Sequence, residues 1–311
     1  MEFFVVILDF SQIFLANIFI DPQMSLLSKN PTEENRLFLK HMSFNTVRAY
    51  NVKYGKQYGQ MVIALDGQNL WRREYFPNYK ITRKASRDKS DLDWDYIFSV
   101  GNEIKEDMEK YFPFPMIGCD GAEADDVIGV LTKLKSENSD EEDIMGRSTA
   151  EPIMILSSDG DFVQLHKYPN VKQFSPAQKK LVKSTVNPKR FLIEKIITGD
   201  TGDSVPNIRT GDDFFERKVA GEKVRQPPIT QKYIDQLLKD PSAFNSAEDK
   251  RNFDRNETLI SFDKIPSAVY NNIVDVYNAK KDKKVSKLEL MNYFVANRMQ
   301  QLNSNVQDFF L

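Results

Sequence analysis

Short apolar runs alternate with longer amphipathic segments in the first half of the chain. The apolar runs predict buried strands over residues 3–8, 61–65, 116–119 and 153–156. Between them, the spacing of apolar positions predicts helices over residues 33–54, 94–111 and 124–135. Residues 136–151 are polar and acidic and indicate an exposed loop. Alternation of strands and helices is typical of a parallel sheet covered by helices, so we expect an α/β fold.

The pattern changes after about residue 183. Residues 188–198 predict a helix with proline near its start, and from residue 231 onward the signals are mostly helical. We therefore expect a parallel-sheet domain over residues 1–185, a smaller and mostly α-helical domain over 186–305, and a short tail over 306–311. No run approaches the roughly 20 apolar residues of a membrane helix. The apolar N-terminus is short and lacks the basic leader of a signal peptide.

The composition limits the kinds of functional site that the chain can contain. The 311 residues are 41% hydrophobic, which is enough for a sizeable core, and the net charge is only −2. The chain has one cysteine, Cys119, and two histidines, His41 and His166. This excludes an internal disulfide framework and zinc sites built on Cys/His clusters, leaves little room for a Ser-His-Asp triad, and favours a reducing, cytosolic setting. If the chain is an enzyme, its chemistry should depend on carboxylates.

In five segments of the chain, acidic residues follow a predicted strand, open a helix or bracket a glycine-containing loop. These residues are Asp9, Asp66, Glu123, Asp125, Asp126, Asp159, Asp161, Asp200 and Asp203. The carboxyl ends of parallel strands meet at one edge of a sheet, where ligands usually bind. Carboxylate oxygens suit Mg²⁺ or Mn²⁺. Two such ions could activate a water molecule and stabilise the leaving oxygen when a phosphodiester is hydrolysed.

Each acid taken alone is more often a turn former or a helix cap than a metal ligand. The cluster at residues 123–126 could simply complement a helix N-terminus. The repetition of the pattern makes coincidence less attractive. On this pattern alone, a metal site and a set of structural caps are equally favoured.

A long basic and aromatic stretch, residues 68–95, follows Asp66. Its candidate contacts to nucleic acid are Arg72, Arg73, Tyr79, Lys80, Arg83, Lys84 and Arg87. Cations bind phosphates, and aromatic faces accept unstacked bases. A basic run alone is more often a solvated surface loop. Here it directly follows a candidate metal ligand, which favours a clamp for a phosphodiester substrate.

Several motifs resemble those of the flap endonuclease/5′-3′ exonuclease family, and in particular its phage members with RNase H activity that remove RNA primers. The matching segments are residues 9–12, 71–73, 123–126 and 157–173, and the similarity extends from about residue 5 to 300. The resemblance implies a PIN-like nuclease domain, with residues 68–95 as a helical arch. In that arch, Lys80 and Arg83 would contact the scissile phosphate.

The resemblance also assigns the acids to two metal ions. Asp9, Asp66, Glu123, Asp125 and Asp159 would surround the first ion, with Asp125 essential for catalysis. Asp161, Asp200 and Asp203 would surround the second, while the role of Asp126 stays open. In one departure from the family, residues 209–215 lack the repeated glycines of a helix-turn-helix that grips duplex DNA. Nearby basic residues are candidate substitutes: Arg209, Arg217, Lys218, Lys223 and Arg225.

The implied function is a Mg²⁺-dependent 5′-3′ exonuclease with RNase H and flap endonuclease activity. It would remove RNA primers during phage DNA replication in the cytoplasm of an infected host. Its substrates would be RNA–DNA hybrid, duplex and flap DNA, with the single-stranded-DNA-binding protein as a candidate partner and the protein acting as a monomer. Two alternatives are a PIN-like endoribonuclease that cuts single-stranded RNA and a non-catalytic binding factor. The long basic arch disfavours the first, and the complete acid set disfavours the second.

The C-terminal tip resembles short peptides that dock into sliding clamps. Its candidate docking residues are Gln307, Phe309, Phe310 and Leu311. Two aromatic anchors on an extended peptide can fill an apolar pocket on a partner. The alternative is that these residues pack on their own domain.

Overall fold

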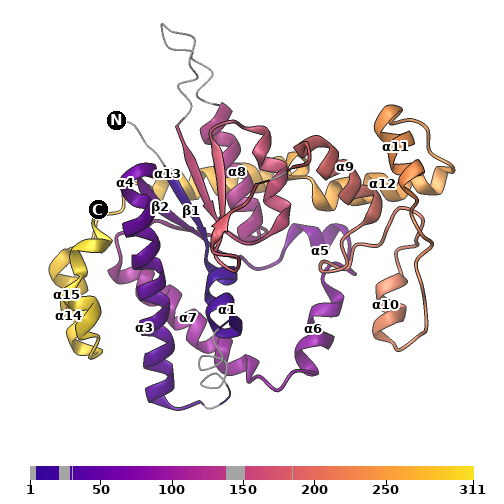
Figure 1. Cartoon of the computed structure of the whole chain (residues 1–311). Helices are drawn as coiled ribbons and strands as arrows, with labels where there is room; N and C mark the ends of the chain where they lie inside the picture. Colours follow the sequence, from indigo (N-terminus) through magenta and orange to yellow (C-terminus); the bar gives the residue numbers. More distant parts are fainter. Residues whose placement is uncertain (1–4, 21–28, 30, 138–150, 184) are drawn as a thin grey trace, which may run out of the picture.

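One six-stranded sheet organises the computed structural model, which describes residues 5–20, 29, 31–137, 151–183 and 185–311 (Figure 1). The strand order is β3-β2-β1-β4-β5-β6. The strands are β1 (Val5–Asp9), β2 (Gln60–Ala64), β3 (Met116–Ile117), β4 (Ile153–Leu156), β5 (Val171–Ser175) and β6 (Lys180–Leu181). All neighbouring pairs are parallel except β5 and β6, which are antiparallel. The expected α/β class with a mostly parallel sheet is therefore confirmed.

Helices cover both faces of the sheet, and alternate residues of β1 point to opposite faces. Val6 and Leu8 belong to one apolar cluster, whereas Val5 and Ile7 belong to the other. The first cluster is covered by α1 (Phe10–Ile20), α3 (Glu33–Tyr50), α7 (Trp94–Tyr111), α14 (Lys287–Ala296) and α15 (Gln300–Ser304). The second is covered by α8 (Ala124–Glu137) and α13 (Ser267–Lys280). Every residue of β1 is buried, and the strand is a run of apolar residues that ends at Asp9.

The chain after β2 forms the predicted helical arch. It contains α5 (Trp71–Tyr75) and α6 (Ile81–Asp88), and it leads into α7 (Figure 1). A smaller helical region lies next to the arch. It contains α9 (Pro188–Thr198), α10 (Phe214–Val219), α11 (Gln231–Lys239) and α12 (Ala247–Ile260). Phe76 and Tyr79 at the base of the arch pack with Ile196 of α9 and Leu259 of α12, so this region holds the arch in place.

The last third of the chain does not stay in that helical region. After η3 (Phe262–Lys264), α13 packs on the second sheet face, and α14 and α15 pack on the first. Among the described residues, the change in sequence pattern near residue 185 therefore marks the end of the strands. It does not separate the cores, because the segments after η3 complete both layers around the sheet.

Most predicted elements lie where the apolar pattern puts them, and α7 and α9 have the predicted bounds. The helix predicted over 33–54 is α3, which continues as η1 (Asn51–Gly55) and α4 (Lys56–Tyr58). The short strands β5 and β6 and the apolar helix α1 were not predicted. The predicted loop over 136–151 lies mostly outside the described residues, as do the first residues of the strand predicted over 3–8. In the described part of the chain, no helix is long and apolar enough to span a membrane.

The structure of the C-terminal tip contradicts the prediction that it docks into a sliding clamp. η4 (Val306–Phe309) packs against the sheet domain, and the side chain of Phe309 is only 2% exposed. Asp308 pairs with Arg48 of α3, and its carbonyl oxygen accepts a hydrogen bond from Asn51 at 2.8 Å. Val306 and Phe309 are therefore part of the core, and the segment does not form a free peptide with two aromatic anchors. The segment instead packs on its own domain, which was the alternative interpretation.

Candidate active site at the sheet edge

The strand order reverses direction between β1 and β4, and the crevice at such a reversal is where open α/β sheets bind ligands. Asp9 is the last residue of β1, Asp159 follows β4, and Asp66 follows β2 on the other side of β1. The charges of Asp66 and Asp159 both act on Asp9. The structure therefore brings together three acids from segments more than 50 residues apart.

Asp9 lies at the centre of this group and is almost completely buried. One carboxylate oxygen accepts a hydrogen bond from the backbone N–H of Gln12 at 3.0 Å, and the other accepts one from the hydroxyl of Ser157 at 3.2 Å. Burial, and then the charges of Asp66 and Asp159, raise the pKa of Asp9 to about 7. A carboxylate in this position is stabilised by a nearby cation.

Asp125, in the first turn of α8, belongs to the same group. Burial, and then the charges of Asp159 and Asp9, raise its pKa well above the ordinary value of an aspartate. Asp66 holds this turn, because one of its oxygens accepts a hydrogen bond from the N–H of Ala124 at 3.0 Å. Its other oxygen accepts one from the hydroxyl of Ser11 at 2.7 Å. The start of α8 is thereby fixed to the ends of β1 and β2.

A second set of acids faces Lys195, which projects from α9. The ammonium group of Lys195 contacts Asp161 and lies 2.8 Å from Asp200. Asp159 accepts a hydrogen bond from the N–H of Asp161 at 2.8 Å, which connects this set to the first one. Burial raises the pKa of Asp159, and the charge of Lys195 partly offsets that rise. Lys195 is thus a positive charge placed between carboxylates.

The base of the arch adds a further set of charges. Lys80 is buried, contacts Glu123 and lies 3.6 Å from Asp203. Arg83 is half-exposed and lies 2.6 Å from Asp203. Burial would raise the pKa of Asp203, but the charges of Lys80 and Arg83, together with hydrogen bonds from Tyr79 and Arg83, outweigh burial and lower it. The backbone of Lys80 has a φ of 58°, in the left-handed region that non-glycine residues seldom occupy. Its N–H donates to the carbonyl oxygen of Asp203 at 2.8 Å, which holds the arch to the acidic edge in this conformation.

Three residues predicted for the site are instead buried and paired inside the protein. Asp126 is completely buried, and one of its oxygens lies 2.7 Å from Arg72. It also accepts hydrogen bonds from the indole N–H of Trp71 at 3.1 Å and from the N–H of Glu123 at 3.0 Å. Arg72 is itself only 3% exposed, and Tyr79 is buried with its hydroxyl 2.8 Å from both Glu123 and Asp203. The predictions that Asp126 binds metal and that Arg72 and Tyr79 contact nucleic acid are therefore corrected, because these side chains are enclosed and already paired.

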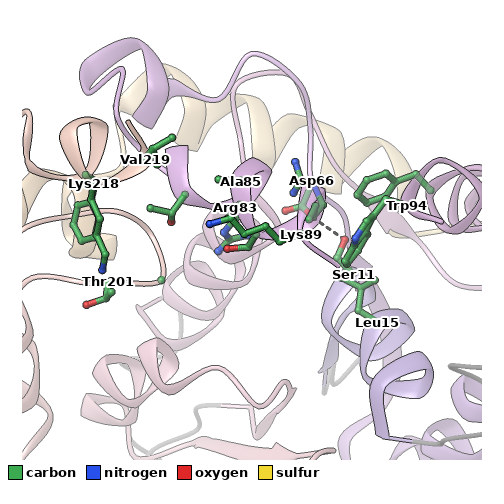
Figure 2. A pocket seen from close by; sticks show the side chains of 16 residues that line it. Ser11, Leu15, Asp66, Arg83, Ala85, Lys89, Trp94, Thr201, Lys218 and Val219 are labelled. Atoms are coloured by element: carbon green, nitrogen blue, oxygen red, sulfur yellow. Dashed lines mark hydrogen bonds between the residues drawn. The ribbon is translucent and has the colours of Figure 1, made fainter. Parts of the chain in front are cut away.

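The remaining basic residues of the arch face solvent or a cleft of about 840 Å³ beside the acidic edge (Figure 2). Arg83 and Arg87 line this cleft from α6, and Lys89 lines it from just beyond the end of that helix. Ser11 and Asp66 line it from the side of the sheet edge. Figure 2 shows Lys218, Val219 and Thr201 on the side opposite Trp94, with Arg83 between them. Arg73 and Lys84 are exposed but do not line this cleft. The cleft therefore extends from the cations of the arch to Asp66 at the acidic edge.

The donor set fits divalent metal ions, since it consists of carboxylate oxygens whose negative charges oppose one another. Among the described residues, however, no three acidic, histidine or cysteine side chains already converge on one point as metal ligands would. Lys80 and Lys195 supply the positive charge among these acids. Metal binding would therefore require some of these ion pairs to open.

Sequence reasoning missed Ser11, Ser157 and Lys195. Both serines lie within the segments that resemble the family, but a hydroxyl carries no signal of its partner. Lys195 lies in an ordinary amphipathic helix, and only the packing of α9 against η2 (Gly160–Lys167) brings it to Asp161.

Comparisons with known proteins agree with this arrangement. The sequence model of the 5′-3′ exonuclease N-terminal resolvase-like domain matches residues 5–195, and that of the T4 RNase H C-terminal region matches residues 188–309. The chain is 31% identical to the ribonuclease H of Enterobacteria phage T4 over 97% of its own length and 95% of that protein. The chain belongs to the 5′-3′ exonuclease family, and it is a nuclease.

Solved structures share the fold at low sequence identity. The bacteriophage T5 D15 protein, crystallised with metal ions, superposes with a TM-score of 0.59 at 18% identity, covering 89% of this chain and 98% of that one. A complex of the T5 flap endonuclease with DNA and metal ions has the same TM-score at 17% identity, covering 89% and 99% of the two chains. At this level of identity the likeness establishes the architecture alone.

Proposed function

We propose that the chain is a divalent-metal-dependent 5′-3′ exonuclease with RNase H and flap endonuclease activity. It removes RNA primers from lagging-strand fragments during phage DNA replication, in the cytoplasm of the infected host. The observation that carries the proposal is the group formed by Asp9, Asp125 and Asp159 at the strand-order reversal. Their burial and mutual repulsion disfavour the charged carboxylates unless a cation is supplied.

Two magnesium ions would complete this site. Asp9, Asp66, Glu123, Asp125 and Asp159 would hold the first ion, and Asp161, Asp200 and Asp203 the second. When bound, such ions lower the pKa of a water molecule and stabilise the leaving oxygen of a phosphodiester. The metal ions named with the T5 structures support this proposal by analogy.

The chain's own cations orient the substrate. Arg83 lines the cleft and is half-exposed, so its guanidinium can exchange Asp203 for a phosphate oxygen. Lys80 is enclosed between Glu123 and Asp203 and moves only when one of those pairs opens. We propose that both groups contact the scissile phosphate and stabilise the charge that develops on it.

The substrate class follows from the relatives. The phage T4 relative is named a ribonuclease H, and the T5 relative is named a flap endonuclease and was crystallised with DNA. We propose that this chain accepts RNA–DNA hybrid, duplex DNA and flap DNA. We do not propose clamp docking through residues 306–311, because Phe309 is buried in the core.

Cleavage assays on a 5′-labelled RNA–DNA hybrid, a duplex DNA and a single-stranded RNA test the proposal. We expect short 5′ products from the hybrid and the duplex with Mg²⁺, and none with chelator or with Asp125→Asn. The matched control is Asp275→Asn, which changes an exposed aspartate of α13 and should cleave like the wild type. Cleavage of the single-stranded RNA alone would instead favour a PIN-like endoribonuclease, and no cleavage under any condition would favour a non-catalytic binding factor.

A further inference from the structure

Two aromatic side chains of α7 line the cleft together with the cations of the arch. Trp94 and Phe98 lie one turn apart on α7, with ring centroids 5.6 Å apart and an angle of 36° between the rings. The indole N–H of Trp94 donates to the hydroxyl of Ser90 at 2.6 Å, which fixes the orientation of the ring. Phe98 is 44% exposed. A large apolar ring that remains this exposed inside a cleft is available to a ligand.

An arginine lies beside the exposed ring of Phe98. The guanidinium of Arg87 lies 5.7 Å from the centroid of Phe98, within the range of a cation–π contact. Arg83 of α6 and Lys89, directly after that helix, line the same cleft. Aromatic faces beside arginine and lysine form the usual binding surface for single-stranded nucleic acid, because bases stack on the rings and cations bind the phosphates.

The dimensions of the cleft suit such a ligand. Its volume of about 840 Å³ is within the roughly 300–1,000 Å³ of pockets that enclose a small organic molecule. Because Ser11 and Asp66 line the same cleft, a strand that enters it reaches the acidic edge. A base inside a duplex is already stacked on both faces, so a ring that stacks a base selects an unpaired strand.

We propose that Phe98 and Trp94, together with Arg87, form a stacking subsite for a base of an unpaired 5′ strand next to the active site. This inference rests on the proposed function and adds a determinant of substrate preference that is separate from the metal-binding acids and from Lys80 and Arg83. Stacking tolerates any base, so the subsite distinguishes substrates by the presence of unpaired nucleotides and not by their sequence.

Phe98→Leu tests the subsite, since leucine keeps an apolar side chain but removes the ring face. The control is Phe38→Leu, the same substitution at a partly exposed residue of α3 that does not line the cleft. For each protein, kcat/KM is measured on a substrate with a 5′ single-stranded arm and on a duplex without one. We expect Phe98→Leu to lower the ratio of the two values about five- to hundredfold, which is the usual contribution of one stacked base. Phe38→Leu should leave the ratio at the wild-type value.

Abasic nucleotides in the single-stranded arm give the second measurement. In the wild type they should lower binding of the armed substrate by a similar factor, and in Phe98→Leu they should have little further effect. An unchanged ratio in Phe98→Leu, or additive losses from the substitution and the abasic arm, would overturn the stacking subsite. Failure of the wild type to cleave either substrate would instead overturn the proposed function.

Discussion

Two adjacent carboxylates in the first turn of α8 should respond to the same substitution in opposite ways. Asp126 forms a buried ion pair with Arg72, whose side chain is 3% exposed. Asp126→Asn keeps the shape and the hydrogen-bonding capacity of the side chain but leaves the guanidinium without its main partner. Asp125→Asn removes a partly buried charge that is repelled by Asp159 and Asp9.

The magnitudes follow from these contacts. Removal of one partner from a buried ion pair costs about 3–5 kcal/mol. Glu123 remains 3.2 Å from Arg72, so we expect Asp126→Asn to destabilise the protein by about 3 kcal/mol, at the lower end of that range. At roughly 2–4 °C per kcal/mol, the melting temperature should fall by on the order of 10 °C. Asp125→Asn should leave the melting temperature unchanged or raise it.

Thermal unfolding in chelator, followed by circular dichroism, gives the stability of each variant, and cleavage of the RNA–DNA hybrid at 20 °C below the lower melting temperature gives its activity. We expect Asp125→Asn to be stable and inactive, and Asp126→Asn to be less stable but active while folded. The reasoning is refuted if Asp126→Asn keeps its full stability and loses cleavage, because the carboxylate would then act in the reaction and not in the core.

Three further substitutions test the core at the C-terminal tip, the charge of Lys195 and the loop after Asp66. Phe309→Ala should destabilise the protein by about 3–5 kcal/mol, as expected for a phenylalanine buried in a core, and urea unfolding would measure the loss. Lys195→Met removes the ammonium group between Asp161 and Asp200, so Mg²⁺ should raise the melting temperature of this variant more than that of the wild type. Gly67→Ala would place a Cβ atom 1.9 Å from a backbone carbonyl oxygen of the loop after β3. We expect the free energy of unfolding to fall by about 1–3 kcal/mol. Activity should fall as well, because the loop that the new Cβ atom displaces begins at Asp66, a carboxylate of the site.

Each of these expectations has an outcome that contradicts it. A Phe309→Ala variant with wild-type stability would mean that the C-terminal tip does not support the core. An equal Mg²⁺-induced shift in wild type and Lys195→Met would show that the lysine does not compete with metal. Wild-type stability and activity of Gly67→Ala would mean that the close approach of the two loops is easily relaxed.

Local sequence patterns determined the elements and the kinds of chemistry available to this protein. The apolar runs at residues 3–8 and 153–156 are short enough for buried strands, and the spacing of apolar residues over 94–111 has the period of a helix. These patterns depend on neighbouring residues alone, so the sequence contains them in full. Because Asp9 and Asp66 follow strands, the sequence also placed their carboxylates near the active edge.

Tertiary structure decided which of the chemically equivalent residues face the site. Successive residues of a helix point about 100° apart, so Asp125 faces Asp9 while Asp126 faces the interior and Arg72. The sequence of the arch contains a row of cations, but only packing against the core encloses Arg72 and leaves Arg83 half-exposed. Burial and ion pairing depend on segments far apart in the chain, so no local pattern specifies them.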